Sequence, residues 1–252
     1  MPAIRVLPDL LVNQIAAGEV VDRPSSALKE LLENSLDAGA RDIVVQLAAG
    51  GTRLIKVTDD GHGIAREELP LAVARHATSK IASLVDLERV ASLGFRGEAL
   101  ASIASVSRLT LVSRRADDKH AWSISAEGPQ ASAPEPATLT SGTSIEVRDL
   151  YFNTPARRKF LKSEPTEYAH CDETFKRSAL SRCDTAFSLQ HNGRVRRHMK
   201  PQPASDRIAA ILGEEFIATA RLVEETAGPV RLYGYAGSPS SAGAARDAQY
   251  VY

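Results

Sequence analysis

The chain has few cysteines and no long apolar run, and each absence excludes a class of protein. Its only cysteines, Cys171 and Cys183, fit no spacing of metal ligands, so a structural zinc site is not expected and both are predicted to be reduced thiols of a cytosolic protein. No apolar run approaches the roughly 18 residues of a membrane span, and Met1–Leu11 lacks the pattern of a secretion signal. These absences predict a cytoplasmic protein without a membrane partner.

Two further absences concern phosphate binding and charge. No segment matches G-x-x-x-x-G-K-[ST], which excludes a P-loop ATPase. The 31 Lys and Arg residues balance 31 Asp and Glu, so formal net charge is zero. Residues 148–200 nevertheless contain 12 Lys and Arg against 6 Asp and Glu. Such a local excess indicates a polyanion-binding surface, although a solvated basic helix surface explains it equally well.

The apolar pattern predicts an α+β sandwich, with one mixed, mostly antiparallel sheet and helices on one face. The strict strand–helix–strand alternation of a doubly wound parallel fold is absent. A helix is expected from Ser25 or Ser26 to Asp37, with Gly39 as its stop. The other expected helices are one capped by Asp9 that runs through Val20, and Glu67–Ala74, Glu98–Ala104, Pro155–Leu161, Thr166–Leu180 and Asp206–Leu212. Expected strands are Ile43–Leu47, Leu54–Val57, Leu109–Val112, Ala121–Ser125, Ser144–Val147, Thr185–Leu189, Val195–Met199, Ala218–Val223 and Val230–Ala236.

Three segments bear on domain organisation. Pro201–Pro203 is the best linker candidate, so we expect one domain at residues 1–200 and the start of a second at residues 204–252. Ala131–Thr140 is rich in Ala, Pro and Ser, and it lies between two expected strands without a clear secondary-structure pattern of its own. The last residues, Tyr250–Tyr252, resemble the middle of a strand.

The predicted helix that ends at Asp37 carries polar residues on one face. Leu28, Leu31, Leu32 and Leu36 form its buried stripe, whereas Glu30, Asn34 and Asp37 share another face. A carboxylate one turn from an amide suits metal-assisted ATP hydrolysis, because the carboxylate can deprotonate water and the amide oxygen can bind Mg²⁺. An ordinary polar surface is the simpler explanation of the same pattern.

Two glycine-containing segments could contact a nucleotide. Asp59–Gly63 follows a strand, and its first carboxylate could accept the amino group of adenine while the glycines allow close approach of the backbone. Gly94–Gly97 leads into a helix and could cradle phosphate groups. The Gly94–Gly97 segment lies at the end of a long predicted loop that begins at Arg75. Long loops without regular structure are often functional.

The order of these segments resembles the Bergerat-type (GHKL) ATPase superfamily of gyrase, Hsp90, histidine kinases and MutL. Within it, the chain is most similar to the N-terminal ATPase region of the MutL family of DNA mismatch repair proteins. The likeness covers nearly the whole chain and is looser at 127–140 and after Lys200. The segments that carry it are Asn13–Val20, Glu33–Ala40, Arg75–Lys80, Gly94–Leu100 and Asn153–Leu161.

The resemblance implies a role for each matching residue. Glu30 is implied as the general base and Asn34 as the Mg²⁺ ligand, with Asp37 nearby. Asp59 is implied to read adenine beside Gly61, Gly63 and Thr143. The lid that closes over the ATP phosphates is implied to contain Thr78, Ser79, Lys80, Gly94, Phe95, Arg96 and Gly97.

The resemblance also implies partners. ATP would drive N-terminal dimerisation of a longer protein into a clamp at the nucleoid, linking a mismatch-recognition protein to a downstream nuclease or helicase. Double- and single-stranded DNA would bind without sequence preference. The candidate contacts are Arg157, Arg158, Lys159, Lys162 and Arg177, although Arg157 and Arg158 could instead anchor loops within the fold.

In the family, a ribosomal-S5-like second domain continues past the equivalent of Tyr252 and supplies a lysine to the γ-phosphate. We therefore expect a fragment that binds ATP, hydrolyses it weakly and stays monomeric without nucleotide. The alternatives are an ATP-binding interaction module without turnover and a chaperone- or topoisomerase-like member of the superfamily.

Overall fold

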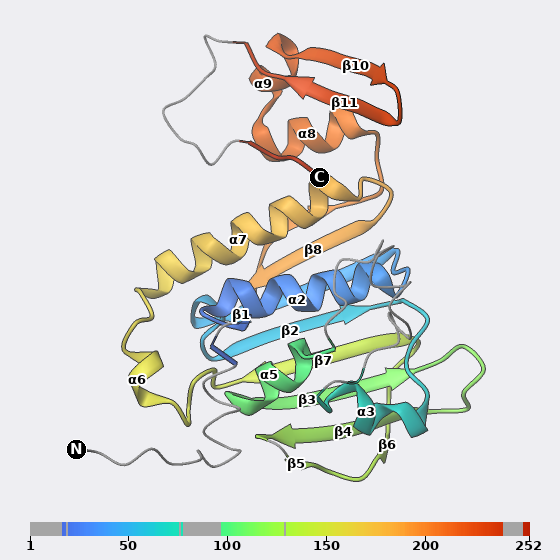
Figure 1. The fold of residues 1–252 in the computed structure, drawn as a ribbon, viewed down its shortest axis with the longest axis vertical. Coiled ribbons are helices and arrows are strands. Elements are labelled where there is room, and N and C mark those ends of the chain that lie inside the picture. The colour runs from blue at the N-terminus through green and yellow to red at the C-terminus, as the bar shows by residue number, and fades with distance from the viewer. Residues whose placement is uncertain (1–16, 19, 76, 78–96, 129, 239–248) are drawn as a thin grey trace.

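The computed structural model describes residues 17–18, 20–75, 77, 97–128, 130–238 and 249–252. Its main feature is a nine-stranded sheet in the order β5-β4-β3-β7-β2-β1-β8-β9, with β6 also paired to β4. All neighbours in this sheet are antiparallel except β1 and β8. Helices α2, α5 and α7 lie on the same side of the sheet (Figure 1). The predicted α+β fold is therefore confirmed.

The strands of the large sheet are β1 Asp42–Ala48, β2 Leu54–Asp59, β3 Arg108–Arg114, β4 Ala121–Glu127, β5 Gln130–Ala131, β6 Glu135–Ala137, β7 Gly142–Arg148, β8 Ala186–His191 and β9 Arg194–Met199. The helices are α2 Pro24–Asp37, α3 Leu69–Ala72, α5 Ala99–Ser105, α6 Pro155–Arg158, α7 Glu164–Ser181, α8 Ala204–Leu212 and α9 Glu214–Thr219, with 3-10 turns η1 Ala49–Gly51 and η2 Arg66–Glu68. A separate hairpin consists of β10 Arg221–Ala227 and β11 Val230–Ala236.

Helix α2 forms where the leucine pattern predicts it. Pro24 occupies the first turn, where its missing N–H costs nothing. Leu28, Leu31 and Leu32 are fully buried in the core between the helix and the sheet. The helix ends at Asp37, and Gly39 follows with a φ of 73°, a left-handed conformation that favours glycine. The polar face of α2 is thereby held in a fixed position over the sheet.

The strand register brings polar residues together at one end of the sheet. Asp59, the last residue of β2, lies opposite Thr143 on β7, and Thr143 lies opposite Ser113 on β3. Because these are neighbouring strands, the three side chains belong to one small area. The candidate site is built around this area.

Four segments differ from the expectations, and most of the helix expected after Asp9 lies outside the described residues. The helix expected at Pro155–Leu161 ends at Arg158. Ala218–Val223 was predicted as a strand, but Glu214–Thr219 is helical and β10 begins only at Arg221; Glu214 and Glu215 in the first turn favour a helix N-terminus. The weak segment after Ala131 contains the short strand β6, which pairs with β4 at the sheet edge. Tyr250–Tyr252 is not a strand.

Arg207 attaches α8 to the rest of the structure. Its side chain is 0% exposed and its guanidinium donates to the carbonyl oxygens of Ala179 at 2.7 Å, Thr185 at 2.9 Å and Lys200 at 2.9 Å. These acceptors come from the end of α7 and the two ends of the β8–β9 hairpin. Several carbonyl dipoles thus replace water around a buried charge.

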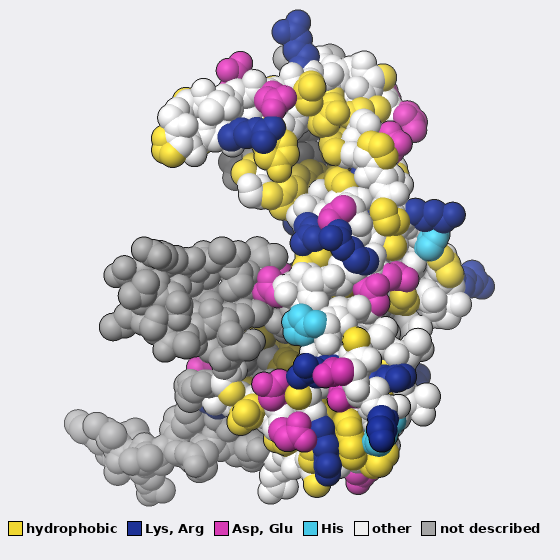
Figure 2. All heavy atoms as spheres, turned by 90° about the vertical axis from the view of Figure 1, so that its right-hand side faces the viewer, with side chains coloured by type: hydrophobic (Ala, Val, Ile, Leu, Met, Phe, Trp, Pro, Cys, Tyr) yellow, Lys and Arg dark blue, Asp and Glu magenta, His cyan; other side chains and the backbone are white. Residues whose placement is uncertain are grey.

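The β10–β11 hairpin presents apolar side chains to solvent. In Figure 2 hydrophobic side chains gather in the upper part of the molecule, where this hairpin lies. The exposed ones are Leu222, Val230, Leu232 and Tyr233. No helix among the described residues is both long and apolar enough to cross a membrane.

Candidate functional site

The carboxyl group of Asp59 is the centre of the site. It is only 8% exposed and accepts three hydrogen bonds. The Ser35 hydroxyl on α2 donates to Oδ2 at 2.7 Å, while the backbone N–H groups of Gly61 and Thr143 donate to Oδ1 at 3.0 and 3.3 Å. A carboxylate has about four lone-pair positions, so the group retains capacity for one donor from outside the protein.

Burial raises the pKa of Asp59, and the hydrogen bonds from Ser35, Gly61 and Thr143 offset only part of that rise. A raised folded-state pKa means that this group contributes stability at low pH, and the contribution is lost as pH rises through the folded-state pKa. The buried carboxylate therefore opposes folding at neutral pH. A buried, perturbed carboxyl group of this kind is typical of functional sites.

Glycines keep the surroundings of Asp59 free of side chains. Gly142 has a φ of 78°, and a Cβ there would collide with the carbonyl oxygen of Asp59. Gly63 has a φ of 73°, and a Cβ there would collide with the backbone of Arg114. Both positions combine a left-handed conformation with close packing, so only glycine fits.

Ser113 holds the segments around Asp59 in register. Its hydroxyl oxygen accepts the N–H of Ile64 at 2.8 Å and lies 3.0 Å from the carbonyl oxygen of Gly142, to which it donates. It is also 2.9 Å from the Thr143 hydroxyl. Ser113 and Ser35 were missed by the sequence analysis. A signal existed for Ser35, since it is a small polar residue within the buried face of α2.

The three polar residues of α2 lie on the helix that supplies Ser35. Glu30, Asn34 and Asp37 are all half-buried. Lys29, the residue before Glu30, places its Nζ 2.9 Å from Glu33 and 3.8 Å from Glu30. Lys29 therefore pairs primarily with Glu33. Glu30, the candidate base, and Asn34, the candidate Mg²⁺ ligand, thus lie on the same helix as Ser35. Ser35 in turn binds Asp59 at the end of β2.

Most candidate lid residues lie outside the described part of the chain: Thr78, Ser79, Lys80, Gly94, Phe95 and Arg96. Gly97 is described and has a φ of 61°, two residues before α5 begins. Its left-handed conformation agrees with a glycine at this turn.

The basic candidates have different surroundings. The Arg157 guanidinium lies against Gly18, where a Cβ would collide with it, so this residue packs within the fold. Arg177 lies 3.2 Å from Glu173 and 4.7 Å from the ring centre of Tyr250. Arg158 and Lys162 are exposed and line a pocket, and Lys159, next to Arg158 in the chain, is also exposed.

Comparison with known proteins gives a consistent result. Residues 22–149 match the family model described as histidine kinase-, DNA gyrase B-, and HSP90-like ATPase. The chain is 59% identical over 251 residues to the DNA mismatch repair protein MutL of Herminiimonas arsenicoxydans, covering 99% of this chain and 41% of that protein. The MutL of Thiobacillus denitrificans is 57% identical, with 99% and 42% covered. The chain thus spans about two fifths of the length of these curated relatives.

Solved structures share the fold. The Aquifex aeolicus MutL ATPase domain complexed with ADP is 32% identical, with a TM-score of 0.66 over 82% of this chain and 73% of that chain. The N-terminal domain of a DNA repair protein aligns with a TM-score of 0.76 at 24% identity, over 91% of this chain and 73% of that chain.

Proposed function

Because the chain belongs to the histidine kinase-, DNA gyrase B- and HSP90-like ATPase family and, within it, to the MutL ATPase domains, we propose that it is a slowly hydrolysing, ATP-driven switch of DNA mismatch repair. The observation that carries the proposal is the buried carboxyl group of Asp59, which is held by three donors and surrounded by glycines. This arrangement suits a flat ring with an exocyclic amino group.

Asp59 selects adenine by hydrogen-bond complementarity. The amino group of adenine donates to the free lone pair of the carboxylate, whereas guanine presents a carbonyl oxygen at that position. Thr143 lies beside the same carboxylate, and in this proposal the turns at Gly61 and Gly63 let the backbone come close to the ring. A nucleobase without this donor would leave one lone pair of the buried Asp59 carboxylate unsatisfied, which costs more than the lost contact alone.

Glu30 is the general base and Asn34 binds Mg²⁺ in this proposal, with Asp37 on the next turn of α2. Within the described part of the chain, no group of three or more His, Cys, Asp or Glu side chains is placed to hold a metal ion. The Asn34 amide oxygen would be one ligand of an ion that takes its others from phosphate and water. Bound Mg²⁺ would neutralise phosphate charge, while Glu30 orients and deprotonates the attacking water.

The remaining roles concern the larger assembly. We propose that Thr78, Ser79, Lys80 and the Gly94–Gly97 segment close over the phosphates, and that closure favours dimerisation of the full-length protein into a clamp on DNA. Residues 204–252 would begin the second domain of that protein. Its partners would be a mismatch-recognition protein and a downstream nuclease or helicase, in the cytoplasm at the nucleoid.

Removal of Mg²⁺ tests the proposed activity. With excess Mg²⁺, the chain is expected to bind ATP and to release phosphate slowly; with EDTA in place of Mg²⁺, phosphate release is expected to fall to background, because the phosphate charges then lack their counter-ion. Calorimetry and a phosphate-release assay measure the two quantities. Failure to bind ATP with Mg²⁺ present would contradict the proposal, and equal phosphate release in EDTA would remove the role given to Asn34.

A further inference from the structure

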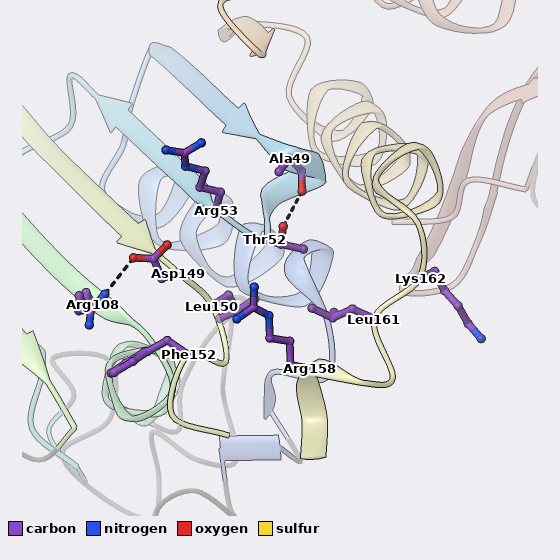
Figure 3. Close-up of a pocket in the computed structure, with 10 residues that line it drawn as sticks. All are labelled: Ala49, Thr52, Arg53, Arg108, Asp149, Leu150, Phe152, Arg158, Leu161 and Lys162. Atoms are coloured by element: carbon purple, nitrogen blue, oxygen red, sulfur yellow. Dashed lines mark hydrogen bonds and ion pairs between the residues drawn. The ribbon is translucent and has the colours of Figure 1, made fainter. Parts of the chain in front are cut away.

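Three residues opposite one another on neighbouring strands place their side chains on one face of the sheet. Thr143 on β7 lies between Asp59 on β2 and Ser113 on β3, and directly opposite residues project to the same side. Ser35 of α2 contacts Asp59 from that side. The pocket drawn in Figure 3 is lined by Arg53, which lies beyond the other end of β2, and a strand of this length spans about 20 Å. The three residues are therefore separate from that pocket and belong to the proposed nucleotide site.

The hydroxyl group of Ser113 has no unused hydrogen-bonding capacity for a donor of its own. A serine hydroxyl has one proton to donate and two lone pairs that accept. One lone pair accepts the backbone N–H of Ile64 at 2.8 Å, and the carbonyl oxygen of Gly142 lies 3.0 Å away. Because a carbonyl oxygen can only accept, the Ser113 proton belongs to that contact. Without it, the lone pairs of two oxygens would repel each other at this distance.

The direction of the hydrogen bond between Ser113 and Thr143 follows from this count. Their hydroxyl oxygens are 2.9 Å apart, and Ser113 has only a lone pair left for the contact. Thr143 must therefore donate its single proton to Ser113, and its own hydroxyl keeps only lone pairs for a ligand. Ser113 is 0% exposed, so solvent does not compete for these positions. The ionised carboxyl group of Asp59, which accepts the N–H of Thr143, is likewise an acceptor without a proton.

We propose that Ser113 is a positioning residue for nucleotide selection: by accepting the Thr143 proton, it leaves this edge of the site with acceptors only. The inference rests on the proposed function and extends the adenine-reading role from Asp59 to a fully buried residue that would not touch the nucleotide. An exocyclic amino group has two N–H donors and suits two neighbouring acceptors. A ring carbonyl oxygen at the same place finds no donor.

The first test compares the affinities for Mg·ATP and Mg·ITP by calorimetry. The base of ITP carries a carbonyl oxygen where adenine carries its amino group, and it lacks the additional amino group of guanine. In Ser113→Ala the Thr143 hydroxyl is free to turn and donate to that carbonyl oxygen. We expect the ratio of ATP affinity to ITP affinity to fall by about 3- to 10-fold, which corresponds to about one hydrogen bond.

Two further variants separate positioning from stability. Ser107→Ala is the matched control, because Ser107 is also 0% exposed and donates to a backbone carbonyl oxygen, that of Ile103 at 2.7 Å, just before the opposite end of β3. It should lower the melting temperature without changing the ratio of ATP to ITP affinity. If Ser113 acts through Thr143, Thr143→Val alone and Thr143→Val combined with Ser113→Ala should have the same ratio. A further fall in the double variant would contradict the inference.

A direct measurement on the unaltered chain tests the inference even where Ser113→Ala does not fold. Neutron diffraction from crystals of the perdeuterated chain locates the hydroxyl deuterium atoms. We expect the deuterium of Thr143 to point at Ser113 and that of Ser113 to point at Gly142. A Ser113 deuterium that points at Thr143, or an unchanged affinity ratio in Ser113→Ala, would overturn the inference and leave the proposed role of Asp59 intact. Equal affinity of the unaltered chain for ATP and ITP would instead contradict the proposed function.

Discussion

Replacing Glu30 with glutamine is expected to lower the rate of ATP hydrolysis by roughly 10²- to 10⁴-fold while ATP binding changes little. The amide has nearly the same shape as the carboxylate but cannot take a proton from water. Glu30 is half-buried on α2, one turn from Asn34, and its neighbour Lys29 is nearer to Glu33. A half-buried carboxylate on the same helix face as Asn34 is placed to act as the base in this proposal.

Single-turnover phosphate release at saturating Mg·ATP measures this effect separately from binding. Glu33→Gln provides the control, because it removes a carboxylate from the same helix whose partner is the Lys29 ammonium at 2.9 Å. We expect this control to retain most of the hydrolysis rate. Turnover of Glu30→Gln at the unaltered rate would show that another group is the base. Binding of ATP without any turnover in the unaltered chain would favour the alternative of an ATP-binding interaction module.

Replacing Asp59 with asparagine is expected to weaken ATP binding by about 10- to 100-fold. The carbonyl oxygen of the introduced amide can still accept the N–H groups of Gly61 and Thr143, and its nitrogen can donate to the Ser35 hydroxyl. That nitrogen then meets the amino group of adenine as donor against donor. An unmatched buried donor costs about 1–3 kcal/mol, and each 1.4 kcal/mol is a factor of about ten in affinity.

The same substitution should not destabilise the fold. Because burial raises the pKa of Asp59, the ionised carboxyl group opposes folding as pH rises through its folded-state pKa. A neutral amide removes that cost, so the melting temperature at neutral pH should equal or exceed that of the unaltered chain. Asp60→Asn is the control: its exposed side chain accepts the N–H groups of Arg41 and Asp42 at 2.7 and 2.8 Å, which an amide oxygen also does. Full ATP affinity in Asp59→Asn would contradict the adenine-reading role.

The regular elements were predictable where local and tertiary preferences agree. Helix α2 has a leucine stripe, a first-turn proline and a terminal glycine, which all favour the same helix. The β1–β2 hairpin likewise combines apolar strands with the Gly50-Gly51 turn. By contrast, Ala218–Val223 contains residues that suit either helix or strand, and only the packed structure decides between them. For such segments local preference is too weak to determine the outcome.

The sequence suggested the candidate carboxylates but not the residues that hold them in place. Asp59 and Glu30 were proposed because carboxylates in these patterns match a known ATPase arrangement, and their roles stay predictions. Ser113, which holds Gly142 and Ile64 beside Asp59, depends on contacts between strands that are distant in the chain. The buried Arg207 has no sequence signal at all, since its partners are backbone carbonyl groups. Interactions with the backbone leave no pattern of residue types.

The central claim is that the buried carboxyl group of Asp59 recognises adenine. A calorimetric titration of the chain with Mg·ATP and with Mg·GTP tests it most directly, because the two nucleotides differ at the ring edge that this carboxylate would read. We expect a clear preference for ATP, since guanine would place a carbonyl oxygen against the carboxylate oxygen, itself an acceptor. Equal affinity for the two nucleotides would contradict it.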